Sequence, residues 1–552
     1  MTMAACMGLP GAALAAGAAP RSGYIVEAAD THSAARAVQR VGGRVTHELP
    51  IVNGVSALLS TAEAARLRAA SELEVFADAA VRTQGSQPLP VSTPDIYQRS
   101  MMGVNALAAM GITGKGVLVA IVDSGILQAT KLTSLTHDLN NKNRMLAQYD
   151  AINNVLVDAN HPCANFPCVN DDYGHGSHIT SLIASVNMTD AVLKGEPQGI
   201  APNAQLINVK AFDGNGSATY ASVLNGLNWI LQNRTTYGAI RVVNMSFGAK
   251  PQSFYWNDPI DQAVMKLWQA GIVVVASAGN FGPKAQTIAV PGNTPYVITV
   301  GAMTDNFTPN DPTDDGVTSF SSAGPTYEGF IKPDVVAPGG HLAAFMDQNV
   351  QVLATNHAQF ASTDLNMFVM SGTSQAAAVT TGVVALMLQT NPTLTPDQVK
   401  CRLIASADAA IGAGGNAAYT VFQQGAGRVN AYAAVFSVAG NCANQGLNIA
   451  ADIAGTKHFG GPARQDATTG NFYVVDSNGD ALGNQGYLWN NSFVKGQGYL
   501  WNNGYLWNNG YLWNNGYLWN NGYLWNNGYL WNQSSMAPAS TPTAMESWNA
   551  QE

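Results

Sequence analysis

The stretch GVLVAIVDSG, residues 116–125, decides the fold, because an unbroken apolar run from Val117 to Val122 ends at an aspartate, Asp123. A run of Val, Leu and Ile without alternation is typical of a strand buried on both faces, and so indicates a parallel sheet covered by helices. Similar runs alternate with helical stretches such as ATYASVLNGLNWILQN, and they occupy residues 204–212, 240–248, 271–280 and 295–302. The region 96–440 is therefore expected to be an α/β domain with its ligand site at the carboxyl ends of the strands.

Four polar residues fall at such strand ends or helix starts. They are Asp123, His175 in DDYGHGSHIT (171–180), Asn280 after VVVASAG, and Ser374 in MSGTSQAAA (370–378). Each has a simpler explanation when taken alone: Asp and Asn form turns, and Ser is a preferred N-cap. His175 and His178 also have a spacing that can bind metal, although no third ligand is apparent.

In this order the four residues resemble the subtilisin-like serine proteases, the subtilase family. The resemblance rests on six blocks: AIVDSGI, DDYGHGSHIT, NMSFG, SAGN, KPDVVAPG and SGTSQAAA. It implies a parallel, seven-stranded type of sheet with helices on both faces. It also implies a serine endopeptidase in which Ser374 attacks the peptide carbonyl, His175 transfers the proton and Asp123 orients His175 through an acyl-enzyme pathway. Asn280 would then stabilise the oxyanion together with the Ser374 N–H.

The resemblance also implies a cleft that binds the substrate as an added strand, with protein or peptide substrates that carry an apolar residue before the cleaved bond. His178 matches a structural position. The substrate-binding candidates are Ser246, Phe247 and Gly248 on one strand, Ala276, Ser277, Ala278 and Gly279 on the wall of the first pocket, and Asn215, Gly216 and Ser217 on the second flanking strand.

The family pattern is not followed at every position. Ala377 and Ala378 stand where a small residue and a proline are usual, Gln375 replaces a Met-like residue, and Ser177 stands where Thr is common. No cofactor is required for the chemistry. Structural calcium is common in the family, and Asp171 and Asp172 are candidate ligands, but no complete ligand set can be matched.

The N-terminal part predicts export and maturation. Residues 1–19 are small and apolar and resemble a partial signal peptide. Residues 20–95 are expected to form a propeptide with its linker, because residues 23–82 follow a ferredoxin-like β-α-β-β-α-β order with LEVFADAAVR as the closing strand. By resemblance, this segment acts as an inhibitor of its own protease domain. A secreted or cell-surface protein is therefore expected.

Composition limits the other functions. The net charge of −9 excludes nucleic acid as the main partner, and no stretch after the first residues is apolar enough to suggest a transmembrane helix. Four cysteines lie beyond the candidate signal peptide. The simplest of three pairings is Cys163–Cys168 with Cys401–Cys442, the alternative being four free thiols.

The C-terminal part changes character. A Gly/Asn-rich linker is expected at 441–485, a repeat region at 486–533, in which the array contains GYLWN seven times from Gly486 on, and a disordered tail at 534–552. The repeats can form a meander or a solenoid, contact a polysaccharide or cell envelope through aromatic side chains, or stay unfolded. Two further hypotheses follow: a surface-binding protein whose protease domain only matures it, and an inactive protease homologue.

Overall fold

The computed structural model describes residues 20–83, 97–127, 133–163, 169–187, 195–308, 311, 313–362, 367–410, 417–475 and 481. Its contacts divide the chain into two units, Met1–Asp78 and Ala79–Glu552. The candidate signal peptide, the linker from residue 84 on and all GYLWN repeats lie outside the described residues.

The first unit has the predicted β-α-β-β-α-β order. Its strands are joined only by antiparallel pairs, in the order β2-β3-β1-β4. Both helices have side-chain caps: Asp30 accepts from Ser33 N, and Ser60 and Glu63 form a capping box. The elements are β1 (Arg21–Glu27), α1 (Thr31–Arg40), β2 (Arg44–Leu49), the 3-10 turn η1 (Pro50–Val52), β3 (Gly54–Ser60), α2 (Thr61–Arg68) and β4 (Glu74–Ala77).

The predicted closing strand over 73–82 is wrong as a single element. Strand β4 ends at Ala77, and a separate strand, β5 (Ala80–Thr83), belongs to the second unit. Strand β5 pairs with β10 (Ser217–Thr219) and β12 (Phe247–Gly248), whereas β4 pairs with β1. The physical reason is that the two short runs have different pairing partners, which the local sequence does not reveal.

The second unit is built on a sheet of nine strands, of which seven run parallel in the order β16-β14-β13-β11-β6-β9-β7. Strands β15 and β8 pair with it in antiparallel fashion. Every residue of the opening run in β6 is buried, as expected for a strand covered on both faces. The strands are β6 (Leu118–Asp123), β7 (Met145–Asp150), β8 (Val155–Asp158), β9 (Gln205–Lys210), β11 (Ile240–Met245), β13 (Val273–Ser277), β14 (Ile298–Thr304), β15 (Gly316–Val317) and β16 (Val335–Pro338).

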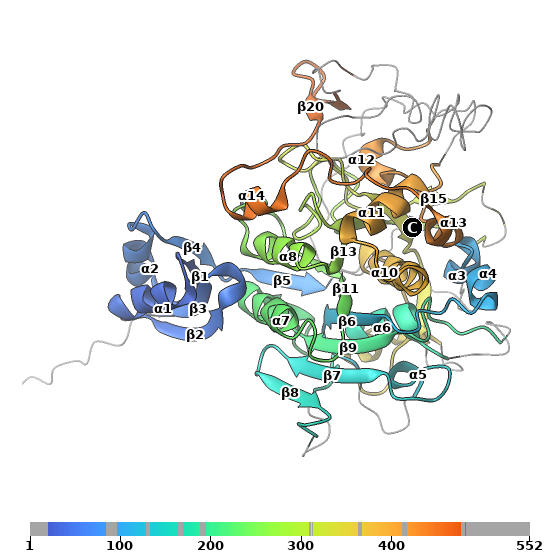
Figure 1. Ribbon diagram of the computed structural model, residues 1–552, viewed down its shortest axis with the longest axis horizontal. Coiled ribbons are helices and arrows are strands. Elements are labelled where there is room, and N and C mark those ends of the chain that lie inside the picture. Colours follow the sequence, from blue (N-terminus) through green and yellow to red (C-terminus); the bar gives the residue numbers. More distant parts are fainter. Residues whose placement is uncertain are drawn as a thin grey trace, which may run out of the picture. The chain divides into compact units, whose positions relative to one another are not determined.

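Long helices cover both faces of this sheet, as Figure 1 shows. Helices α6 (His175–Ala184) and α10 (Thr373–Thr390) pack together on one side, and α7 (Tyr220–Gln232) and α8 (Pro259–Gln269) pack together on the other. Helix α10 is buried from Thr373 to Leu388 and consists largely of Ala, Val, Thr and Gly, so it lies close to the strands. The predicted α/β architecture is confirmed.

Shorter elements complete the second unit. Three short strands form a small sheet in the order β17-β19-β18, between β16 and α10 in the sequence. The full set of shorter elements is α3 (Gln98–Met101), α4 (Val104–Ala109), α5 (Thr133–Thr136), β17 (Leu342–Phe345), α9 (Val352–Asn356), the 3-10 turn η2 (Ala358–Phe360), β18 (Ala361–Ser362), β19 (Met367–Met370), α11 (Pro396–Ala405), α12 (Val421–Gln424), α13 (Ala431–Phe436), α14 (Ile449–Ile453), β20 (Ala463–Gln465) and β21 (Phe472–Val474).

The expected linker at 441–485 is folded over residues 441–475, which corrects the prediction. Helix α14 packs against α8, and Asp452 accepts hydrogen bonds from the hydroxyls of Tyr255 (2.6 Å) and Tyr296 (3.0 Å). Gly and Asn occupy caps and turns here, as Asn448 does at the start of α14, so a composition that indicates a linker instead belongs to a folded segment.

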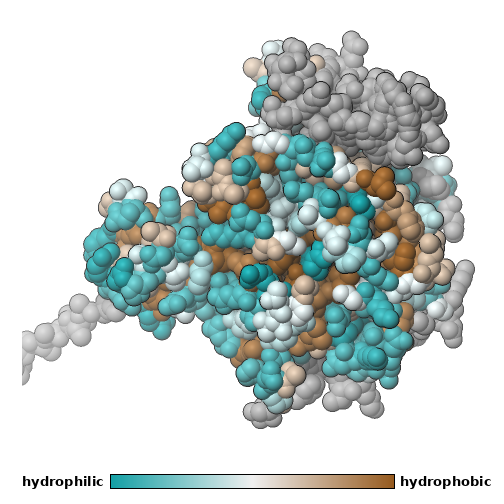
Figure 2. All heavy atoms as spheres, in the orientation of Figure 1, coloured by the Kyte–Doolittle hydropathy of each residue, from teal (hydrophilic) through white to brown (hydrophobic). Residues whose placement is uncertain are grey.

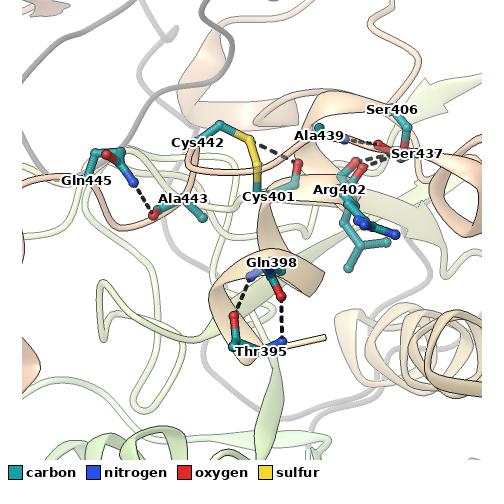
Figure 3. Close-up of a disulfide and its surroundings, with 11 residues drawn as sticks. Thr395, Gln398, Cys401, Arg402, Ser406, Ser437, Ala439, Cys442, Ala443 and Gln445 are labelled. Carbon is teal, nitrogen blue, oxygen red and sulfur yellow. Dashed lines mark hydrogen bonds between the residues drawn. A yellow bond between two sulfur atoms is a disulfide. The ribbon is translucent and has the colours of Figure 1, made fainter. Parts of the chain in front are cut away.

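A disulfide joins Cys401 in α11 to Cys442, as predicted, and Figure 3 shows the bridge beside the capped start of that helix. Cys163 is also disulfide-bonded. Its predicted partner Cys168 lies outside the described residues, so that pairing stays a prediction.

The visible surface in Figure 2 is largely hydrophilic, with apolar residues interspersed. Across the described part of the chain, no helix has both the length and the apolar character needed to cross a membrane.

Candidate active site

Asp123 and His175 form a buried pair. Asp123 is the last residue of β6, and His175 is the first residue of α6 after Gly174, whose φ of 113° favours glycine. His175 Nδ1 lies 2.8 Å from Asp123 Oδ1, and the two side chains are 1% and 0% exposed. Because a carboxylate only accepts, this contact places the proton on Nδ1 and leaves Nε2 to accept one.

A second carboxylate, Asp171, accepts hydrogen bonds from the residues that adjoin this pair in the sequence. Its Oδ1 accepts from Ser124 Oγ (2.9 Å) and Gly174 N (2.8 Å), next in sequence to Asp123 and His175 respectively. Its Oδ2 accepts from Ser177 N and Oγ, both at 2.7 Å. Burial raises the pKa of Asp171, while the hydrogen bonds from Ser177 and Gly174 favour its charged form.

Ser374 lies at the start of α10 and contacts the end of β11. Its Oγ donates to Ser246 O at 2.8 Å, and Ser246 Oγ donates to Ser374 O at 2.8 Å. His175 and Ser374 both stand at the N-terminal ends of their helices, and these two helices, α6 and α10, pack against each other. His175 Nε2 is buried and has no hydrogen-bond partner among the described residues.

Asn280 is held in one orientation by the residue before Ser374. Its Oδ1 accepts from Thr373 N (3.0 Å) and from Thr373 Oγ1 (2.8 Å), and Thr373 Oγ1 also accepts from Gly279 N at 3.1 Å. The amide oxygen is therefore engaged on the protein side, and the NH₂ group is the end of the side chain that can donate to a bound molecule.

The chain itself supplies a strand beside these residues. Strand β5 runs antiparallel to both of its neighbours, and Thr83 pairs with Phe247, while Arg82 pairs with Gly248 and Ser217. Thr83 N also donates to Gly216 O at 3.3 Å. Phe247 directly follows Ser246, so β5 leads toward Ser374.

Comparison with known proteins agrees with this geometry. The model of the Subtilase family matches residues 114–427, which is more than half of the chain and includes Asp123, His175, Asn280 and Ser374. The chain belongs to the subtilase family.

Several subtilases are similar to this chain. Serine protease AprX of Bacillus subtilis is 38% identical over 293 residues, which is 52% of this chain and 60% of AprX. Subtilisin E of Bacillus subtilis is 29% identical over 372 residues, 67% of this chain and 79% of subtilisin E. The crystal structure of fervidolysin from Fervidobacterium pennivorans, a keratinolytic enzyme related to subtilisin, matches with a TM-score of 0.58 at 21% identity, covering 85% of this chain and 69% of fervidolysin. That likeness supports the fold.

The predicted substrate-binding residues of this subtilase fall into two groups. Ser217, Phe247 and Gly248 pair with β5, and Gly216 contacts it, as described above. Asn215 instead lies in a turn in which its N–H donates to Asp213 Oδ1 at 2.8 Å, outside the paired strand. The second group consists of buried residues at the end of β13 and directly after it: Ala276, Ser277, Ala278 and Gly279. This second group contacts strand β12, because Ser277 Oγ donates a hydrogen bond to Phe247 O at 2.9 Å.

His178 has a structural setting. Its Nε2 lies 3.0 Å from Phe368 O, and burial, reinforced by the neighbouring His175, lowers the pKa of His178 to about 3. The ring is therefore neutral at ordinary pH. His175 and His178 are held by different partners, a carboxylate and a carbonyl, so the spacing that suggested a metal pair has another explanation here.

The candidate calcium ligands do not fit a cation site. Both oxygens of Asp171 already accept hydrogen bonds from protein donors, and Asp172 Oδ2 lies 3.6 Å from Lys210 Nζ. Within the described ranges, no group of three His, Cys, Asp or Glu side chains is placed to hold a metal ion.

The sequence assigned no supporting role to four residues, one of which, Asp171, it offered only as a calcium ligand. Thr373 orients Asn280, Asp171 buttresses the acid–base pair, Gln351 Nε2 donates to Asp171 Oδ2 at 3.1 Å, and the Tyr173 hydroxyl contacts Thr83. The only available signal was position, because Asp171 and Tyr173 lie within DDYGHGSHIT and Thr373 lies within SGTSQAAA. Gln351 stands just before α9, far from these blocks in the sequence, and gave no signal.

Proposed function

We propose that this subtilase is a serine endopeptidase that cleaves peptide bonds through an acyl-enzyme. The observation that carries the proposal is the buried 2.8 Å contact between Asp123 and His175, beside a serine at the end of a cleft that already binds an extended strand. In the reaction, the Ser374 hydroxyl leaves the Ser246 carbonyl and donates to Nε2 of His175.

Each residue then has a defined role. His175 takes the Ser374 proton as Oγ attacks the carbonyl and returns it to the leaving amine, and water later hydrolyses the ester by the same route. Asp123 keeps the proton on Nδ1 and stabilises the charged imidazolium. The oxyanion is stabilised by the Asn280 NH₂ group, by Ser374 N–H and by the positive end of α10.

The same cleft supports a self-processed zymogen. Residues 79–83 run in the antiparallel direction of an added substrate strand and exclude other peptides while they stay there. The upstream segment then acts as an inhibitor until the chain is cut beyond β5. Secretion or cell-surface display is part of the proposal, because the Cys401–Cys442 disulfide suits an oxidising compartment.

A role of the GYLWN array in binding a polysaccharide or cell envelope stays a prediction, because no described residue bears on it. The same holds for the hypothesis of a surface-binding protein. The inactive-homologue hypothesis is disfavoured, since Asp123, His175, Asn280 and Ser374 are all present and their surroundings are ordered by named contacts.

The test compares the full chain with its Ser374→Ala variant. We expect the wild type to lose its N-terminal segment, to hydrolyse unfolded casein and to gain the mass of a serine-directed phosphonofluoridate on the peptide that carries Ser374. The variant should do none of these. Ser100→Ala is the matched control, because Ser100 is exposed and only its Oγ contact to Tyr97 O is lost. Folded wild type that stays intact, inert and unlabelled would refute the proposal.

A further inference from the structure

Strand β5 shows which residue of a bound peptide meets which part of the cleft. Thr83 lies opposite Phe247, and the carbonyl oxygen of the preceding residue, Ser246, accepts a hydrogen bond from the Ser374 hydroxyl. In a peptide bound in this register, the residue after the place of Thr83 falls opposite Ser246, where its carbonyl is attacked. Thr83 therefore marks the second position before the cleaved bond, and Val81 marks the fourth.

Burial along β5 alternates as this register requires. Val81 and Thr83 are 1% and 6% exposed, whereas Ala80 and Arg82 are exposed. The side chain at the second position is thus enclosed by the cleft, and the groups around it can select among substrates.

The group that meets Thr83 is a phenol. The Thr83 side chain interacts with the Tyr173 hydroxyl, and this interaction opposes the rise that burial causes in the pKa of Tyr173. Gly216 makes room for this contact: a Cβ at Gly216 would lie 2.4 Å from Tyr173 ring atoms and 2.9 Å from Thr83 Oγ1. Any larger residue at position 216 would displace the tyrosine ring or the hydroxyl, so the absence of a side chain there is a requirement of this contact.

Tyr173 is fixed before a substrate arrives. Its N–H donates to Asp171 Oδ1 at 3.2 Å, and its carbonyl accepts from Leu353 N at 3.0 Å. Its ring packs against an apolar cluster made of Met346, Leu353, Ala354, Phe360, Phe368 and Met370. Because Tyr173 stands two residues before His175, the phenol is positioned by the same loop that positions the catalytic base.

We propose that Tyr173 is a specificity-determining residue that reads a hydroxyl at the second position before the cleaved bond, so that this protease prefers Thr or Ser there. The inference rests on the proposed function and names a substrate preference for that same site. Valine has the shape of threonine but cannot form a hydrogen bond to the phenol, so the hydroxyl of the half-buried Tyr173 loses that interaction.

The test is a competition between peptides that have the sequence of residues 79–86 and differ only at the place of Thr83, with Thr, Ser or Val. The self-processed full chain is given the mixture, and the ratio of kcat/KM values is read from the relative rates of loss. A net hydrogen bond between neutral groups predicts a preference for Thr over Val of about 2- to 13-fold. The Tyr173→Phe variant should reduce that preference below twofold, and Tyr327→Phe, which alters an exposed tyrosine, should retain it.

Each outcome bears on one claim. A wild-type ratio within 1.5-fold of unity, or an unchanged ratio in Tyr173→Phe, overturns the role of Tyr173. Cleavage of casein without cleavage of any of the three peptides also overturns it, because the register requires the chain's own strand to be a substrate. Folded protein that cleaves neither casein nor the peptides instead refutes the proposed function.

Discussion

Replacing Asn280 separates two effects that the structure assigns to different ends of one side chain. The amide oxygen accepts from Thr373 N at 3.0 Å and from Thr373 Oγ1 at 2.8 Å, and this fixes the start of α10. The NH₂ group is the proposed oxyanion donor. Asn280→Ala removes both functions, whereas Asn280→Asp keeps an oxygen for Thr373 and loses the donor.

The expected magnitudes follow from those contacts. Two lost hydrogen bonds at about 0.5–1.5 kcal/mol each lower the free energy of unfolding of Asn280→Ala by about 1–3 kcal/mol. Loss of one oxyanion donor costs about 10²–10³ in kcat, or about 2.7–4 kcal/mol, a magnitude measured on subtilisin itself rather than obtained from this structure. Asn280→Asp should keep most of the stability and lose at least as much kcat, because a carboxylate repels the developing oxyanion.

The assay measures kcat and KM on one peptide and, separately, unfolding by urea in the Ser374→Ala background, where self-digestion cannot occur. We expect KM to change little, since the donor acts mainly in the transition state. A kcat loss below threefold in Asn280→Ala would remove Asn280 from the oxyanion role. Equal kcat in wild type and Asn280→Asp would refute the assignment of the two ends of the side chain.

Three further predictions follow from the same geometry. Asp123→Asn should lower kcat about 10⁴-fold while leaving the fold intact, because an amide can no longer hold the proton on His175 Nδ1; kinetics with circular dichroism as the folding control check this. Removing the disulfide by a double Cys401→Ala/Cys442→Ala replacement should lower the unfolding free energy by about 2–4 kcal/mol, since it closes a loop with a sequence separation of 41 residues; urea unfolding of the Ser374→Ala protein, with and without reductant, measures it. Self-processing should cut between Gln84 and Gly85, because Gln84 is one residue past the strand that pairs with Phe247. Mass spectrometry of the released segment should therefore find a C-terminal end at Gln84. An end at or before Arg82 would contradict the register.

The sequence predicted the parts of this fold that depend on local pattern. Unbroken apolar runs indicate buried parallel strands, and a polar residue at the end of such a run, such as Asp123, can be identified from the sequence alone. The disulfide between Cys401 and Cys442 also followed from simple pairing. What these features share is that neighbours in the sequence suffice to identify them.

The sequence failed where the partner of a segment decides its role. LEVFADAAVR contains two runs of strand-forming residues, and only the pairing of β5 with β10 and β12 shows that its second half belongs to the second unit. The segment 441–475 has the composition of a linker, yet Asp452 ties it to Tyr255 and Tyr296, which precede it by more than 150 residues. Such contacts are set by tertiary structure and leave no periodic signal.

One buried carboxylate links the stability of this corner to its chemistry. Asp171 Oδ1 accepts from Ser124, which follows Asp123, and from Gly174, which precedes His175, so a single oxygen fixes the end of β6 relative to the start of α6. The 2.8 Å contact between Asp123 and His175 is therefore set before any substrate binds. Preorganised dipoles of this kind lower a reaction barrier because they need no reorganisation during the step. The same loop carries Tyr173, so the residue proposed to select the substrate and the proposed catalytic base share one support.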